Sequence, residues 1–200
     1  MKLREDWQII KERVATIRNE SEKLNMSPAF VTMLIAAEDH RYGSHPGVDP
    51  MSICRAVWRS FFCGRREGGS TIAMQLVRVI TGRYERTFRR KITEMYLAVR
   101  LTKHVRESEL PEFYLVVGYF GWKMNGLAQV SQRLKIDPTN ASELEAANIV
   151  ARLKYPEPRR QDEKRLSRIR DRTRYILLRA DALFGKVPHQ FELSETNGSF

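Results

Sequence analysis

The segment "PAFVTMLIAAED" at 28–39 constrains the fold more than any other part of the sequence. It is apolar almost all round, which is typical of a helix buried at the centre of a core. Ser27 and Pro28 supply an N-cap and a first-turn proline for this helix. The segment then ends in two carboxylates, Glu38 and Asp39. A negative charge there faces the partial negative charge of the helix carboxyl end, which costs about 0.3–1 kcal/mol, so local stability does not explain the two acids.

The rest of the chain shows helical periodicity and no convincing alternating strand pattern. Helices are predicted at 3–24, 50–62, 71–80, 85–105, from Ser108 onward, up to about Ile136, at 142–154 and at 161–184. We therefore predict an all-α fold with a main domain at 28–160. An amphipathic helix at 1–27 precedes this domain, a basic helix at 161–186 packs on it, and 187–200 forms a flexible tail.

The composition favours an anionic partner. The chain has 35 Lys and Arg against 24 Asp and Glu, a net charge of +11, which suits phosphate, nucleic acid or an anionic membrane surface. No run approaches the ~18–20 apolar residues of a spanning helix, and the start lacks the apolar core of a signal peptide, so we expect no membrane crossing. Cys54 and Cys63 lack the spacing of a zinc site or a disulfide scaffold, and we expect two buried free thiols.

Glu38 and Asp39 admit two interpretations. In the first, the apolar helix partly desolvates a carboxylate and raises its pKa above the usual ~4.3, toward the range that suits a general base. In the second, both acids are solvated in a loop and pair with Arg41 or His45. The two acids alone favour the second interpretation, whereas the segments that follow them along the chain favour the first.

Five ordered segments carry a family resemblance: "EDHRYGSHPGVDP", "GGSTIAMQL", "RRKITE", "EFYLVVGYFGWKMNG" and "ELEAANIVARLKYPEP". Over about 30–158 they resemble the signatures of the peptidoglycan glycosyltransferases, the lysozyme-like domain of monofunctional transglycosylases and bifunctional penicillin-binding proteins. The resemblance implies a two-lobed lysozyme-like fold with a small membrane-facing lobe. It also implies polymerisation of lipid II, by transfer of a lipid-diphosphate-linked glycan to the 4-hydroxyl of an acceptor sugar with inversion.

By this resemblance, Glu38 matches the catalytic base, and Glu94 matches a second acid that orients cations or the acceptor sugar. The departing diphosphate needs matched positive charge more than a strong acid. The residues expected to hold the diphosphate or the sugar are Gln75, Arg78, Arg86, Arg90, Lys91 and Ser70. Outside the motifs, Lys91 and Glu94 would be an ordinary surface pair of about 0.2–0.5 kcal/mol. We predict no protein metal site, and leave open a divalent cation, Mg²⁺ or Mn²⁺, at the diphosphate.

Three further residues of the first signature are expected to be structural. Asp39, His45 and Gly47 form a tight turn in which the histidine pairs with the carboxylate or with backbone. A role for His45 as a catalytic proton carrier is the weaker alternative. Ser70 and Thr71 have no evident partner base, so capping of the following helix explains them better than nucleophilic attack does.

Trp58, Phe61 and Phe62 are interleaved with arginines and match the membrane-facing segment of the family. Aromatic residues beside arginines suit the headgroup region of a membrane with anionic lipids. A core stripe with a solvated basic back explains the same pattern equally well. The resemblance thus places the chain at the outer, periplasmic face of the cytoplasmic membrane, held peripherally or through an anchor absent from this chain.

Three positions depart from the family pattern: Val79 and Val116 replace Asn, and Arg78 replaces Lys. The segment "LAQVSQRL" after Gly126 also departs, at the donor end of the groove. Two rivals to the glycosyltransferase therefore stay open: a catalytically weak or silent module that binds lipid II or murein, and a lysozyme-like murein hydrolase. Expected partners are lipid II, the growing lipid-linked glycan, the membrane surface and cell-wall synthesis proteins. We expect no nucleic-acid partner, because no recognition motif is present.

Overall fold

The computed structural model describes residues 2–62, 68–160 and 162–185, with the backbone alone at Val57, Ser60 and Phe61. Its elements, in chain order, are α1 (Lys2–Leu24), α2 (Pro28–Glu38), α3 (Pro50–Phe62), α4 (Ile72–Thr81), α5 (Phe88–Thr102), α6 (Glu109–Val117), β1 (Tyr119–Gly121), β2 (Met124–Asn125), α7 (Gly126–Leu134), α8 (Glu143–Lys154) and α9 (Glu163–Phe184). The predicted all-α class is confirmed. The antiparallel β1–β2 hairpin was not predicted, because strands of two and three residues are too short to show alternation.

Local signals set the bounds of the helices around the site. Thr71 Oγ1 accepts a hydrogen bond from the backbone N–H of Met74 at the start of α4, and Gly82 ends this helix with a left-handed φ of 62°. Thr87 caps α5, so this helix begins at Phe88 rather than at the predicted position 85.

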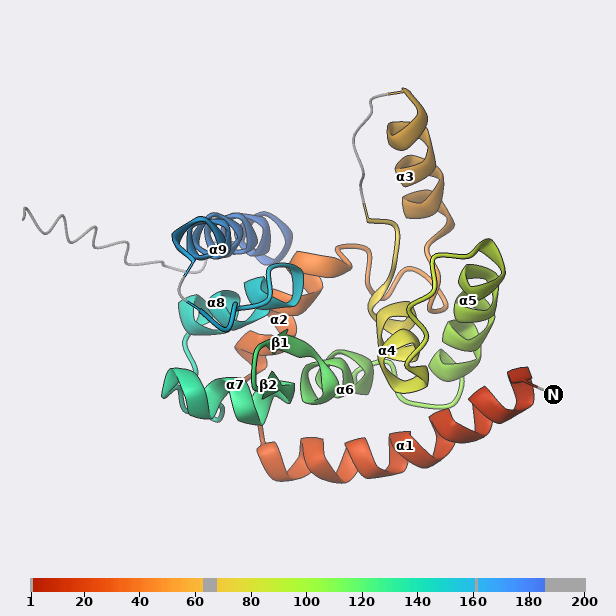
Figure 1. Cartoon of the computed structure of the whole chain (residues 1–200), viewed down its shortest axis with the longest axis horizontal. Helices are drawn as coiled ribbons and strands as arrows, with labels where there is room; N and C mark the ends of the chain where they lie inside the picture. Colours follow the sequence, from red (N-terminus) through yellow and green to blue (C-terminus); the bar gives the residue numbers. More distant parts are fainter. Residues whose placement is uncertain (1, 63–67, 161, 186–200) are drawn as a thin grey trace, which may run out of the picture.

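The helices form two groups with α6 between them (Figure 1). On one side α2, α8 and α9 pack against one another, and on the other side α4 packs on α5. α6 contacts α2, α4 and α7, while α1 runs along the bottom of the view and packs on α4, α5 and α6. Fully buried side chains come from both groups and from α6, among them Phe30 of α2, Leu76 of α4 and Phe113 of α6. The apolar helix α2 thus lies against three other helices, which explains its apolar surface.

α3 projects from this body at the top of Figure 1. Its Met51, Trp58 and Phe62 side chains are exposed, and the ring centroids of Trp58 and Phe62 lie 4.2 Å apart. Large aromatic side chains gathered on an exposed helix are typical of an interaction surface. Among the residues described, none of the helices combines the length and the apolar character needed to cross a membrane.

One expectation about the cysteines is wrong. Cys54 lies on α3 and is exposed. This helix projects from the body, so no core surrounds the thiol. Cys63 and the tail predicted at 187–200 lie outside the described residues.

Candidate active site

Glu38 is the last residue of α2, and donors from two distant helices hold its carboxylate. Gln75 Nε2 on α4 donates to Oε2 at 3.0 Å, and Arg172 Nη2 on α9 donates to Oε1 at 3.1 Å. Tyr114 Oη donates to Gln75 Oε1 at 2.7 Å, which leaves the amide nitrogen of Gln75 facing Glu38. The Glu38 side chain is 18% exposed. A carboxylate offers about four acceptor positions. The carboxylate of Glu38 can therefore still accept a hydrogen bond from a hydroxyl group.

Asp39 joins the end of α2 to the start of α4. Its Oδ2 accepts from the backbone N–H of Ile72 at 3.1 Å, and its Oδ1 pairs with His45 Nε2 at 2.9 Å. A carboxylate at the amino end of a helix faces the positive end of the helix dipole. Gly47 follows with φ +89°, and a Cβ there would lie 2.3 Å from Thr102 Oγ1. This geometry gives Asp39, His45 and Gly47 a structural explanation.

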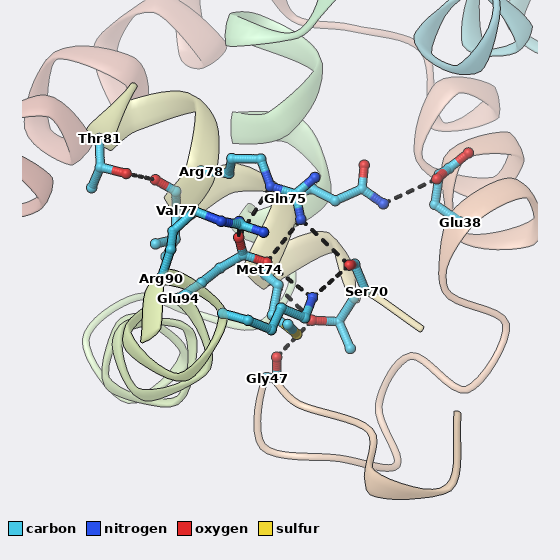
Figure 2. A network of polar contacts seen from close by, with 12 residues as sticks. Glu38, Gly47, Ser70, Met74, Gln75, Val77, Arg78, Thr81, Arg90 and Glu94 are labelled. Carbon is cyan, nitrogen blue, oxygen red and sulfur yellow. Dashed lines mark hydrogen bonds and ion pairs between the residues drawn. The ribbon is translucent and has the colours of Figure 1, made fainter. Parts of the chain in front are cut away.

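Glu94 on α5 lies at the centre of a cluster of cations, the Glu94 cluster (Figure 2). The Glu94 side chain is 3% exposed, and Arg78 donates to it with Nε at 3.0 Å and Nη2 at 2.9 Å. Lys91 Nζ donates to Oε1 of the same carboxylate at 3.2 Å, and Arg90 Nη1 donates to Oε2. Lys91 Nζ also donates to Ser70 Oγ at 2.8 Å. One buried carboxylate thus fixes three cations, which together keep an excess of positive charge.

Burial and charge have opposite effects on the pKa of Glu94. Burial alone would raise this pKa, but hydrogen bonds and positive charges from Arg78 and Lys91 outweigh it, so the pKa lies below its usual value. The pKa of Lys91 is lowered, chiefly by burial, against the opposing charge of Glu94. Glu94 is therefore ionised at neutral pH and serves as the anchor of the cluster.

A cleft of about 610 Å³ opens among α2, α3, α4, α8 and α9. Glu38 is the one carboxylate among the described residues that line it. Six of the lining residues are Lys or Arg, namely Arg55, Arg59, Arg78, Lys154, Arg172 and Arg179. Ser70 and Arg78 belong to both the lining and the Glu94 cluster. The cleft thus combines one acid with a large excess of positive charge, which suits an anionic substrate.

The structure separates the expected diphosphate ligands. Arg78, Arg90, Lys91 and Ser70 come together around Glu94. Gln75 lines the cleft but bonds Glu38 instead of joining the cluster. Arg86 is exposed, and it is absent from the described residues that line the cleft. Thr71, rather than Ser70, caps the following helix.

The aromatic residues of α3 do not form a core stripe. Trp58 is 62% exposed and Phe62 is 70% exposed, whereas the core interpretation requires Trp58 to pack inward. Phe61 was predicted to face the membrane together with Trp58 and Phe62, but its side chain lies outside the described part of the structure.

The contribution of α8 and α9 to the cleft was not predicted from the sequence. Lys154, Arg172 and Arg179 line it, and Arg172 contacts Glu38 directly. One signal pointed this way: α2 has no basic residue in its last turn, so its acidic end needs a cation from elsewhere in the fold. α9 carries many basic residues at helical spacing, and sequence spacing alone does not single out one of them.

Of the three single-residue departures from the family pattern, two lie away from the cleft. Val79 and Val116 are partly buried and pack against the core, and neither is among the described residues that line the cleft. Arg78 lines the cleft, and its planar fork donates two hydrogen bonds to Glu94, a geometry that a lysine does not reproduce. These three departures therefore leave the acid and the cations of the cleft in place.

The donor set does not fit a resident metal ion. Nowhere in the described ranges do three or more His, Cys, Asp or Glu side chains gather at one point. Glu94, the one acid of the cation cluster, already accepts bonds from three cations, whereas Mg²⁺ and Mn²⁺ prefer free oxygen ligands. A divalent ion that arrives with a diphosphate stays a separate prediction.

Several known proteins resemble this chain in sequence. The chain matches the model of the transglycosylase family over residues 8–181. It is 34% identical to penicillin-binding protein 1C of Escherichia coli K12 over 140 residues, which are 69% of this chain and 18% of that protein. It is 40% identical to penicillin-binding protein 1A of the same strain over 106 residues, which are 52% and 12% of the two chains. Penicillin-binding protein 1F of Bacillus subtilis 168 is 36% identical over 125 residues, 60% and 18% of the two chains.

These matches cover less than a fifth of the length of each of the three relatives. The family match is of a different kind, because it spans most of this chain and includes α2, the Glu94 cluster and most of α9. The chain therefore belongs to the transglycosylase family.

Proposed function

We propose that the chain is a peptidoglycan glycosyltransferase that polymerises lipid II into glycan strands, with Glu38 as general base. The cleft carries this proposal, because it sets one carboxylate opposite an excess of Lys and Arg side chains. An attacking hydroxyl needs a base within about 2.6–3.2 Å. A lipid diphosphate becomes a good leaving group when fixed positive charges meet the charge that develops on it. The cleft supports both requirements at once.

In the proposed reaction, the 4-hydroxyl oxygen of the acceptor sugar attacks the anomeric carbon of the lipid-linked donor. The new carbon–oxygen bond forms as the bond from the anomeric carbon to the phosphate oxygen breaks, and the electron pair of that bond leaves with the diphosphate. The proton of the attacking hydroxyl passes to the carboxylate of Glu38. Attack from the side opposite the leaving group inverts the configuration of the anomeric carbon.

The Glu94 cluster would receive the diphosphate. Arg78 and Ser70 line the cleft, and Arg90 and Lys91 pair with the same Glu94 carboxylate as Arg78. Because Glu94 fixes these cations before any substrate arrives, little reorganisation is needed when charge develops on the leaving group. Glu94 then acts as the anchor of the cations and Glu38 as the proton acceptor.

We propose that α3 brings this cleft to the membrane surface at the periplasmic face. Trp58 and Phe62 are exposed on α3, and Arg55 and Arg59 of the same helix line the cleft. Exposed aromatic residues enter the headgroup region, and arginines favour anionic lipids. A lipid-linked substrate would thus meet the cleft where its lipid tail can stay in the bilayer.

The carboxylates favour this reaction over murein hydrolysis. A lysozyme-like hydrolase uses two carboxyl groups that flank the scissile bond. Among the described residues that line the cleft, Glu38 is the only acid, and Glu94 is already engaged by three cations. The excess of positive charge also suits a diphosphate better than the uncharged glycan of murein.

Incubation with two substrates tests the proposal. The protein in detergent micelles is given lipid II in one arm and intact murein in the other. Long glycan strands from lipid II and no soluble fragments from murein are expected. Soluble fragments from murein would indicate a hydrolase, and binding of lipid II without any polymer would indicate a silent module.

A further inference from the structure

Arg172 on α9 contacts the end of α2 at two points. Its Nη2 donates to the carbonyl oxygen of Ala37 at 2.7 Å and to Oε1 of Glu38 at 3.1 Å. Arg172 and Glu38 are 134 positions apart in the sequence, and their side chains are 12% and 18% exposed. This pair is therefore a shielded tertiary contact, unlike a surface ion pair that water screens.

The contact compensates for a local deficit at the end of α2. The last carbonyl groups of a helix have no partner within it, and this end carries a partial negative charge. No basic residue lies in the last turn of α2, and Glu38 adds a full negative charge there. A single nitrogen of Arg172 supplies both a hydrogen-bond donor for the carbonyl and a positive charge for the carboxylate.

Neighbours on α9 preset the guanidinium group of Arg172. Its central carbon lies 4.8 Å from the centre of the Tyr175 ring. Arg179 donates to the hydroxyl of the same tyrosine and lies over its ring as well. α9 in turn packs on α2 and α8. A cation over an aromatic face is held by the ring quadrupole, so Arg172 has little freedom to leave Glu38.

We propose that Arg172 is a positioning residue for Glu38, and that α9 is thereby part of the catalytic apparatus. The inference rests on the proposed role of Glu38 as general base. Arg172 ties Oε1 to the backbone of α2, while Gln75 holds Oε2 from α4. The carboxylate is thus fixed from both sides of the cleft, and its remaining acceptor positions are available to the acceptor hydroxyl. A base displaced by about 1 Å loses about 100-fold in rate.

Steady-state kinetics of the full chain with lipid II tests this role. Arg172→Met removes the charge and both hydrogen bonds but keeps a long side chain, and we expect its kcat to fall about 100-fold with KM changed less than about threefold. Arg172→Lys keeps a charged nitrogen and should stay within about tenfold of wild type. Arg174→Met removes an exposed arginine from the same helix and should leave kcat unchanged. Circular dichroism of every variant checks that the helices persist.

Each outcome decides between the proposals. A wild-type kcat in folded Arg172→Met would overturn the positioning role, and so would a raised KM with kcat unchanged, which marks a substrate ligand. If Arg172→Met does not fold, Arg172→Gln takes its place, because its side chain is polar and suits a partly exposed helix position while it lacks the charge. Glu38→Gln in the same assay separates the two claims. If it stays active, the proposed base is wrong, whereas an inactive Glu38→Gln beside a fully active Arg172→Met refutes only the inference about Arg172.

Discussion

Replacing Glu94 by glutamine should destabilise the whole fold, even though the substitution changes little in shape. Four hydrogen bonds from three cations converge on this buried carboxylate. Glutamine keeps one acceptor oxygen, turns an amide N–H₂ toward other donors, and leaves the cations without their counter-charge. Removing one partner of a fully buried pair costs about 3–5 kcal/mol. The three cations are 16–30% exposed and regain some hydration, so we expect a loss of about 2–4 kcal/mol.

Urea unfolding followed by circular dichroism at pH 7 measures this loss, which corresponds to a Tm lowered by about 4–15 °C. Glu20→Gln, the same change at an exposed position of α1, is the matched control and should cost under about 0.5 kcal/mol. The pKa of Glu94 is lowered from 4.5, so its contribution is present above that pH and is lost as the pH falls through the lowered pKa. The difference in the free energy of unfolding between wild type and Glu94→Gln should therefore become smaller at acidic pH. Equal stabilities at pH 7, or a gap that widens in acid, would refute this account of the cluster.

Other parts of the fold give three more expectations. Hydrogen bonds from Arg18 and Arg106 lower the pKa of Glu109 from 4.5 to about 2. The free energy of unfolding of Glu109→Gln should therefore be lower than that of wild type above pH 4.5, and this difference should disappear as the pH falls toward 2. Gly47→Ala should lower Tm markedly, because its positive φ and a Cβ 2.3 Å from a neighbouring hydroxyl both oppose a side chain. Replacing Trp58 and Phe62 by serine should weaken co-sedimentation with anionic vesicles while thermal unfolding stays unchanged.

The sequence predicted the helices because their signals are local. N-caps, prolines and helical spacing of apolar residues act within a few positions, as at Ser27 and Pro28 for α2. The β1–β2 hairpin was not predicted, because its strands are too short to show an alternating pattern of apolar and polar residues. The exposure of Cys54 was not predicted, because it depends on the projection of α3 from the body. No local sequence signal indicates how far a helix lies from the core.

In the candidate site, too, local contacts were predictable from the sequence and contacts between distant helices were not. Lys91 and Glu94 lie three positions apart on one helix, so sequence spacing predicted their contact. The position of Gln75 beside Glu38, and the pairing of Glu38 with Arg172, depend on how distant helices pack. Sequence could state that the acidic end of α2 needs a cation, but only the packing of α9 on α2 selects Arg172 from the many basic residues of α9.

The most direct test of the whole account is the rate of glycan formation from lipid II by Glu38→Gln beside wild type, under conditions in which both proteins show the same helical circular dichroism. Glutamine has nearly the same shape and keeps one acceptor oxygen, which can serve Gln75 or Arg172, but it cannot take up the proton of the acceptor hydroxyl. We expect the rate of Glu38→Gln to be lower by about 100- to 10,000-fold, the range of a lost general base. A rate within a factor of about three of wild type would contradict it, because the carboxylate of residue 38 would then not be the group that accepts the proton.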